Sequence, residues 1–480
     1  MVSLPFTNGF YKSDSLPVSA QECINWYPSI PDAPALNQEI LFGTPGLSQV
    51  ATAGGSGGYA SRGGHRLNGT PYFVQGSSLF RLNSDGSLDD VGSIEGTGRV
   101  SMADNGTQLM ILVPGSVGYI FTEGSGTLTT ITDAGFTANG NPLYVVFIDS
   151  YFVCTTDSNK FIISANNDGT SWDALDYSSA EASPDGTTAP VVFNNQLFIG
   201  GDRTIEGFTN VTSGADFPFS RSGLFIDIGI TAPFSVVNTP AAFFWVGAGE
   251  RESPSIWSLS GNQPQKVSTQ AIDQILSRLN QSELAEVYGF AYAQAGHYFV
   301  GFALPNTAIV YDIATQRWHE RRSRIVLNDG AIEVRPWRVS SIVSAYGKLY
   351  ASDVLDGRIG VVDIDEYQEY GANVVRAFST QPFHDGTRSF FVPALELTVE
   401  SGVGNGDAPD PSMTLEVSRN GGKTYSGGLI RKIGKEGDYN RRAIWRRLGR
   451  SARFDVYRFT LSEPVKPVVI MLTADIRPAA

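Results

Sequence analysis

A unit of two short strands recurs along most of this chain, and the recurrence limits which folds the chain can adopt. Each unit has an apolar strand, a turn rich in Gly, Ser and Asp, and a second short strand. Successive second strands start 40 to 53 residues apart, near Leu79, Tyr119, Phe161, Ile205, Ile256, Ile309 and Ile359. Repeats of about 40–50 residues are typical of β-propeller blades, which stack around an axis because one blade cannot bury both its faces alone.

The repeat therefore predicts an all-β protein with a β-propeller of about six or seven blades over residues 51–370. One or two β-sandwiches, which also have evenly spaced strands, are the alternative. The 52 glycines and 25 prolines interrupt the chain too often for long helices. Residues 1–50 are expected to supply closing strands of the propeller or an arm onto a neighbouring subunit.

One segment, near residues 269–287, departs from the β pattern. It places Ile272, Ile275, Leu276 and Leu279 at the three- and four-residue spacings of an amphipathic helix. A second helix is expected to start at Ser282, as its cap. We interpret the pair as an insertion between two blades, with Arg278 and Glu283 directed toward a neighbouring subunit or another partner.

The remainder, residues 371–480, has a different pattern. Leu395, Leu397 and Val399 alternate with polar residues, as half-buried antiparallel strands do. We expect a separate C-terminal β-sandwich or barrel-like domain.

Charge is divided unevenly along the chain. The net charge of −13 argues against a general nucleic-acid-binding surface. Residues 431–453 nevertheless hold nine basic residues and two acidic ones. This segment is either a solvated face or a docking surface for an acidic protein partner, with Trp445 and Leu448 as apolar anchors. The candidate partner-binding residues in it are Arg441, Arg442, Trp445, Arg446, Arg447, Leu448 and Arg450.

No pattern of catalytic residues is evident in the sequence. The four histidines lack metal-ligand spacing, the two cysteines cannot form a zinc site, and no phosphate loop or nucleophile elbow occurs. Residues 418–425 resemble the Asp-box turn of sialidases, with Asn420 in place of the usual Asp. A sialidase-like propeller enzyme is therefore kept as an alternative, but we expect no catalytic residue, cofactor or metal. No apolar run approaches the about 20 residues that span a membrane.

Several short motifs, in the expected order, resemble the packaged-DNA stabilisation proteins of short-tailed bacteriophages, also called tail hub or nozzle proteins. The motifs are Leu4–Phe6, Asn25–Pro28, Arg99–Ala103, Ala182–Gly186, the helical pair Ile272–Leu284, Ala308–Asp312 and Arg441–Arg450.

The resemblance implies a structural virion protein, made in the host cytoplasm and added to the tail after genome packaging. Members form a homo-oligomer, a hexameric ring beneath the portal-adaptor (head-to-tail connector) protein. The ring retains the genomic DNA, which passes through its channel without sequence-specific contact during ejection. It also attaches the tail needle and tailspike or fibre proteins. A host-receptor-binding tail protein is a further possibility, although such proteins usually have shorter repeats.

Overall fold

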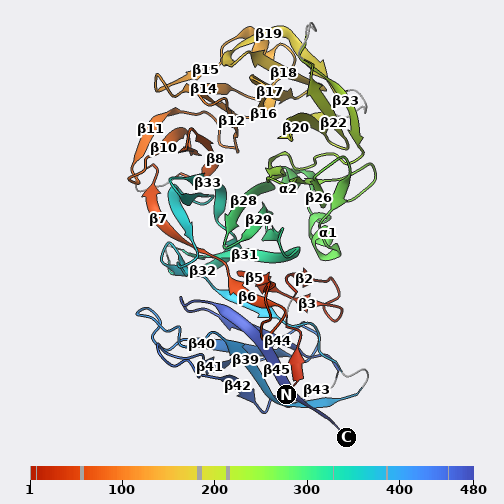
Figure 1. Cartoon of the computed structure of the whole chain (residues 1–480), viewed down its shortest axis with the longest axis vertical. Coiled ribbons are helices and arrows are strands. Elements are labelled where there is room, and N and C mark those ends of the chain that lie inside the picture. The colour runs from red at the N-terminus through yellow and green to blue at the C-terminus, as the bar shows by residue number, and fades with distance from the viewer. Residues whose placement is uncertain are drawn as a thin grey trace.

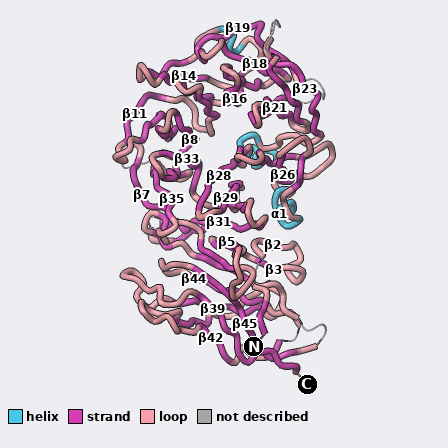
Figure 2. The backbone as a smooth tube through the Cα atoms, viewed as in Figure 1, coloured by secondary structure: helices cyan, strands magenta, loops and turns pink. Residues whose placement is uncertain are grey.

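Short antiparallel strands joined by tight turns make up most of the protein in the computed structural model, and helices are confined to a few short segments (Figure 2). The structure describes residues 2–6, 8–54, 59–180, 186–211, 217–327, 329–384, 388–451 and 453–479. Figure 1 shows a large ring of small sheets above a second β-structure, which contains both chain termini.

Five consecutive four-stranded sheets form the first part of the ring. Blade 1 is β8 (Ser61–Leu67), β9 (Thr70–Gln75), β10 (Ser78–Leu82) and β11 (Leu88–Ser93). Blade 2 is β12 (Ser101–Asp104), β13 (Gln108–Leu112), β14 (Gly118–Thr122) and β15 (Thr127–Thr130). Blade 3 is β16 (Pro142–Ile148), β17 (Tyr151–Thr156), β18 (Lys160–Ala165) and β19 (Asp168–Ser179). Blade 4 is β20 (Thr187–Phe193), β21 (Gln196–Gly201), β22 (Ile205–Asn210) and β23 (Phe219–Ile226). Blade 5 is β24 (Val237–Asn238), β25 (Phe243–Gly247), β26 (Ser255–Leu259) and β27 (Pro264–Lys266).

Two further four-stranded units complete the ring within larger sheets. Blade 6 is β28 (Tyr288–Gln294), β29 (His297–Ala303), β30 (Ala308–Asp312) and β31 (Arg317–Val326). Blade 7 is β33 (Val339–Ala345), β34 (Lys348–Asp353), β35 (Arg358–Asp363) and β7 (Gly46–Thr52). Because β7 comes from the N-terminal segment and pairs antiparallel with β35, the start of the chain supplies the outer strand of the last blade.

Apolar side chains between neighbouring blades hold the ring together. Seven clusters of buried residues each join one blade to the next. In the last of these, Phe73 and Leu82 of blade 1 pack with Val343 and Ile359 of blade 7, so the ring is closed. The predicted all-β fold with a propeller of six or seven blades is confirmed, with seven blades.

The two short helices lie between β27 and β28, where the helical stripe predicts an insertion. They are α1 (Gln270–Leu276) and α2 (Gln281–Ala285). Ile272 and Leu276 are buried against blades 5 and 6. The expected cap at Ser282 is wrong, because Asn280 caps α2 in a capping box with Glu283.

The C-terminal region packs two sheets face to face as a β-sandwich. One sheet has the order β42 (Ala443–Arg446), β39 (Phe390–Val399), β45 (Val468–Pro478), β6 (Ile40–Gly43) and β5 (Trp26–Ser29), with β1 (Val2–Leu4) and β43 (Arg450–Ser451) beside it. The other has the order β4 (Cys23–Ile24), β38 (Arg376–Ser379), β44 (Val456–Leu461), β40 (Ser412–Ser418) and β41 (Leu429–Lys432). Leu395 and Leu472 of the first sheet share a core with Phe378, Leu415 and Phe459 of the second.

Propeller and sandwich are joined through the short strand β4. It pairs with β31 of blade 6 on one side and with β38 on the other, so one hydrogen-bonded sheet runs from the propeller into the sandwich. Asn25, which is 2% exposed and has a left-handed backbone (φ 56°), follows β4. Its side-chain amide donates to the carbonyls of Arg322 (2.9 Å) and Val375 (2.8 Å), and its Oδ1 accepts from the Arg322 amide (3.0 Å). One buried side chain therefore bonds to both halves.

We predict that Asn25→Ala lowers the free energy of unfolding by on the order of 2–4 kcal/mol, because it leaves buried backbone groups without partners and places Ala in a left-handed conformation. Chemical denaturation measures the change. Asn167→Ala is the matched control, since Asn167 has a similar backbone (φ 52°) but an exposed side chain. Equal losses in the two variants would show that the Asn25 amide does not matter.

Candidate partner-binding surface

The arginine-rich segment forms an outer edge of the sandwich. Strand β42 pairs only with β39 among the described strands, with Arg446 opposite Ala394 and Trp445 opposite Leu395. Since side chains alternate across a strand, Arg446 points outward while Ala443 and Trp445 point into the core. After a turn at Arg447–Gly449, β43 continues along the same edge of β39.

The five arginines of this edge, named the basic face here, are Arg441, Arg442, Arg446, Arg447 and Arg450, and all five are exposed. Arg442 is bonded to Glu396 through two of its nitrogens, Nε at 2.6 Å, and Arg450 donates to the Ser389 hydroxyl (2.9 Å). In the part of the chain that the structure describes, Arg441, Arg446 and Arg447 make no ion pair. Charged side chains on an edge strand also discourage pairing with the edge strands of other molecules. This effect would explain the cluster without a binding partner.

Two predicted members of the surface lie elsewhere. Trp445 is 0% exposed, donates to the Leu429 carbonyl (2.6 Å) and packs edge-on against Phe459. Leu448 is also buried. The expectation that these residues are apolar anchors exposed among the arginines is therefore wrong. The run of arginines indicates an exposed segment. Alternation of side chains along the strand predicts that Trp445, which is next to Arg446, points inward.

The two predicted residues of the helical insertion have partners within this chain. Glu283 accepts from the Asn280 amide (2.9 Å) as part of the capping box. Arg278 pairs with Asp14 and so ties the N-terminal segment to α1. Figure 1 places α1 near β2 (Tyr11–Lys12) and β3 (Ala20–Gln21), away from β42 at the far edge of the sandwich. The structure therefore does not bring these residues together with the basic face, and their binding of a partner stays a prediction.

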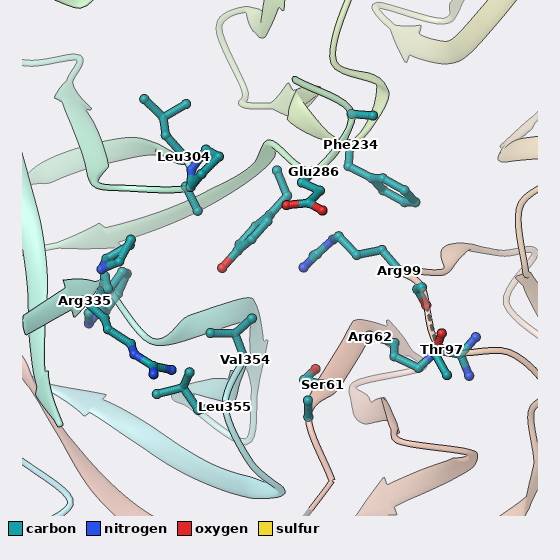
Figure 3. Close-up of a pocket in the computed structure, with 18 residues that line it drawn as sticks. Ser61, Arg62, Thr97, Arg99, Phe234, Glu286, Leu304, Arg335, Val354 and Leu355 are labelled. Atoms are coloured by element: carbon teal, nitrogen blue, oxygen red, sulfur yellow. Dashed lines mark hydrogen bonds between the residues drawn. The ribbon is translucent and has the colours of Figure 1, made fainter. Parts of the chain in front are cut away.

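A cavity of about 620 Å³ lined by residues of blades 1, 6 and 7 is a second candidate site (Figure 3). Arg99 projects into it, stacks over Tyr288 at 3.9 Å and donates to Ser340. Burial lowers the pKa of Arg99. The Arg62 guanidinium donates hydrogen bonds to four backbone carbonyls, those of Gly76, Ile94, Glu95 and Gly98.

Most of the remaining lining is apolar, and among the described residues that line it Glu286 is the one carboxylate. Glycosidases ordinarily use a pair of carboxyls, which this cavity does not offer. The turn that resembles an Asp box is built as a structural element. Its Asn420 accepts from the amides of Lys423 (3.1 Å) and Thr424 (2.9 Å), and two glycines adopt positive φ angles.

His297 and His319 lie together on blade 6, where both contact Tyr27 and Phe299, whereas His65 is on blade 1. His65 contacts Asp104 and His297 contacts Asp312, each at 2.7 Å, on different blades. His319 is 0% exposed, and neither of its ring nitrogens has a hydrogen-bond partner among the residues that the structure describes. No group of three or more potential metal ligands occurs among the described residues. Within the same residues, neither helix is long and apolar enough to cross a membrane.

Comparison with known proteins decides what kind of protein this is. Residues 2–367 match the family model described as "Bacteriophage P22 Gp10, beta-propeller", and residues 375–477 match "Bacteriophage P22 Gp10, beta-sandwich". The chain belongs to the bacteriophage P22 Gp10 family. A relative, the tail hub protein gp10 of Salmonella phage P22, is 23% identical over 397 residues, which cover 80% of each chain. The protein is thus a structural component of a phage tail hub, and the resemblance drawn from its motifs is confirmed.

Two solved structures of other proteins have a limited similarity to this chain. The N-terminal domain of Nup159 has a TM-score of 0.42 at 11% identity and covers 72% of this chain and 99% of its own. A chain of the mitotic checkpoint complex has a TM-score of 0.41 at 12% identity, covering 70% and 98%. Likenesses this low say nothing about function.

The family motifs have different places in the fold. Asn25 of the motif Asn25–Pro28 lies at the junction of propeller and sandwich. Arg99 of the motif Arg99–Ala103 lies in the cavity. Of the motif Ala182–Gly186, residues 182–185 lie outside the described residues.

Buried His319 predicts a sensitivity to acid. Burial, and then Arg321 and His297 nearby, lower its pKa well below 6.5, whereas the unfolded chain takes up the proton below about pH 6.5. The free energy of unfolding should therefore fall as the pH drops below about 6.5, by up to about 1.4 kcal/mol per pH unit from this group. In His319→Phe, which adds no titratable group beside Tyr27 and Phe299, this loss is absent.

Urea denaturation at pH 5, 6, 7 and 8 measures the free energy of unfolding of the variant and of the parent. The difference between the two should shift in favour of the variant at low pH. Phe299→Leu, a change to a neighbouring ring that does not titrate, should give a constant difference. A constant difference for His319→Phe as well would contradict the assignment of a neutral, unpartnered histidine.

Proposed function

We propose that this tail hub protein forms a hexameric ring beneath the portal-adaptor protein, retains the packaged DNA, and attaches the tail needle and tailspike or fibre proteins. The observation that carries the proposal is the match of both parts of the chain, propeller and sandwich, to one phage tail hub family. We further propose that no residue is catalytic and that the protein is made in the host cytoplasm before it joins the virion tail.

The centre of the propeller supports a DNA path between subunits. The short helix η3 (Pro233–Ser235) places Phe234 in the middle of the ring, where it packs on Tyr144 and contacts Arg99. Arg99 in turn reaches Ser340 of blade 7, the neighbour of blade 1, and stacks over Tyr288 of blade 6. Because these side chains converge on the cavity between the blades, we propose that a duplex passes through a channel formed by several copies and not through one propeller.

The charge distribution supports a protein partner for the basic face. Residues 371–480 have 16 basic and 11 acidic residues, whereas residues 1–370 have 19 basic and 37 acidic ones. A basic edge on a strongly acidic molecule suits an acidic protein surface, and arginine is the cation favoured at such interfaces. The acidic remainder opposes tight contact with DNA, as expected for a channel through which DNA slides.

The proposal is tested with phage heads that are filled with DNA but lack this protein. The purified parent protein, when it is added, should join the tail and stop the loss of DNA. Arg446→Glu with Arg447→Glu should remain folded, since both residues are exposed and unpaired, but should fail to join, and the parent's joining should weaken at high salt.

The control is Arg251→Glu with Lys348→Glu, which makes the same charge change on exposed propeller residues and should leave joining intact. If the parent itself neither joins nor retains DNA, the proposed function is wrong. If the basic-face variant behaves like the parent, the basic face is only a solvated edge.

A further inference from the structure

Strand β31 extends beyond blade 6 into a two-stranded hairpin with an apolar outer face. Its end pairs with β32 (Ile332–Pro336), which has no other partner among the described strands. Val326 lies opposite Ile332, and Arg324 lies opposite Val334, so these four side chains share one face. Val326, Ile332 and Val334 are 58%, 51% and 61% exposed. Three branched apolar side chains exposed together are typical of an interaction site.

A groove of matching character lies at the other end of β31. It encloses about 790 Å³ between the N-terminal residues and the loop 30–39, and Arg317 contributes to its wall. Ile30, Pro31, Pro34 and Ala35 make much of the lining apolar. Proline-rich walls present a stiff surface, because the ring fixes the backbone.

The hairpin and the groove face opposite sides of the molecule. Arg317, the first residue of β31, lines the groove, and Val326, the last, is on the hairpin face. A strand of ten residues is about 30 Å long, so the two features cannot meet within one chain. Figure 1 agrees: β32 is labelled at the left of the junction, and β2, whose neighbour Phe10 bonds to Trp318, is at the right.

Charges complement one another across these two sites. Arg324 lies on the apolar hairpin face, and Asp32 lies on the loop that borders the groove. Neither has an ion-pair partner in the described ranges. Two oppositely charged side chains, each beside an apolar surface, fit an interface in which they meet.

We propose that the outer face of the β31–β32 hairpin of one copy binds in the 30–39 groove of the next copy, with Arg324 paired to Asp32 across the contact. The occupant is a second copy of this chain, so the inference rests on the proposed ring and names the surfaces that form it. A contact between two different surfaces is head-to-tail, and such contacts close into a ring when the rotation between copies allows it.

Two variants break the two sides separately. The hairpin variant is Ile332→Glu with Val334→Glu, and the groove variant is Asp32→Arg with Ala35→Arg. All four residues are exposed, so both variants should keep the parent's thermal unfolding midpoint. Leu175→Glu is the control, since Leu175 is 81% exposed on the outer strand of blade 3, far from both sites.

Masses in solution are measured with and without purified portal-adaptor rings. The parent and the control should form rings, and each variant alone should stay monomeric. An equal mixture of the two variants should form a dimer and nothing larger, because the groove variant still has an intact hairpin and the hairpin variant an intact groove.

The outcomes separate this inference from the proposed function. If the parent forms rings and the variants do too, or if the variants are monomers whose mixture yields no dimer, the hairpin–groove contact is wrong while the ring stands. If variants form rings but fail to join the portal-adaptor, the hairpin binds that protein instead. A parent that stays monomeric in both conditions overturns the ring and the contact together.

Discussion

The hydrogen bonds of the Asn25 side chain hold together two parts of the protein that could otherwise be separate domains. The buried amide bonds to Arg322 in blade 6 of the propeller and to Val375, which precedes β38 of the sandwich, and strand β4 next to it completes one sheet across both. Breaking such a contact leaves polar groups buried without partners, which costs more than the bonds themselves contribute. Propeller and sandwich are therefore expected to move as one body.

The same N-terminal segment closes both structures. Strand β7 supplies the outer strand of blade 7, and β5 and β6 extend a sheet of the sandwich. Neither half is complete until the chain's beginning has met residues more than 300 positions later, as in the pairing of β7 with β35. Folding of the propeller and of the sandwich is thereby coupled, since both depend on one short segment of chain.

Local sequence patterns predicted the strands of the blades well. They could not predict contacts between residues that are far apart in the sequence. Every strand expected from Leu79 to Ile359 is the third strand of a blade, because strand alternation and turn residues are local signals. Asn280 and Glu283 also carry a capping pattern that could have been read from sequence. Alternation along β42 could have turned Trp445 inward, but it could not show that β39 is the strand beside it. The hydrogen bonds of Asn25 join residues 297 and 350 positions apart, so no local pattern indicates them.

A cryo-EM map of the virion tail tests the central claim most directly, namely that this protein is a rigid two-part subunit of the tail hub. We expect a closed ring below the portal-adaptor, in which every copy has the same arrangement of propeller and sandwich and the DNA channel lies between copies. A tail without this density, or copies in which the sandwich adopts different orientations relative to the propeller, would contradict it.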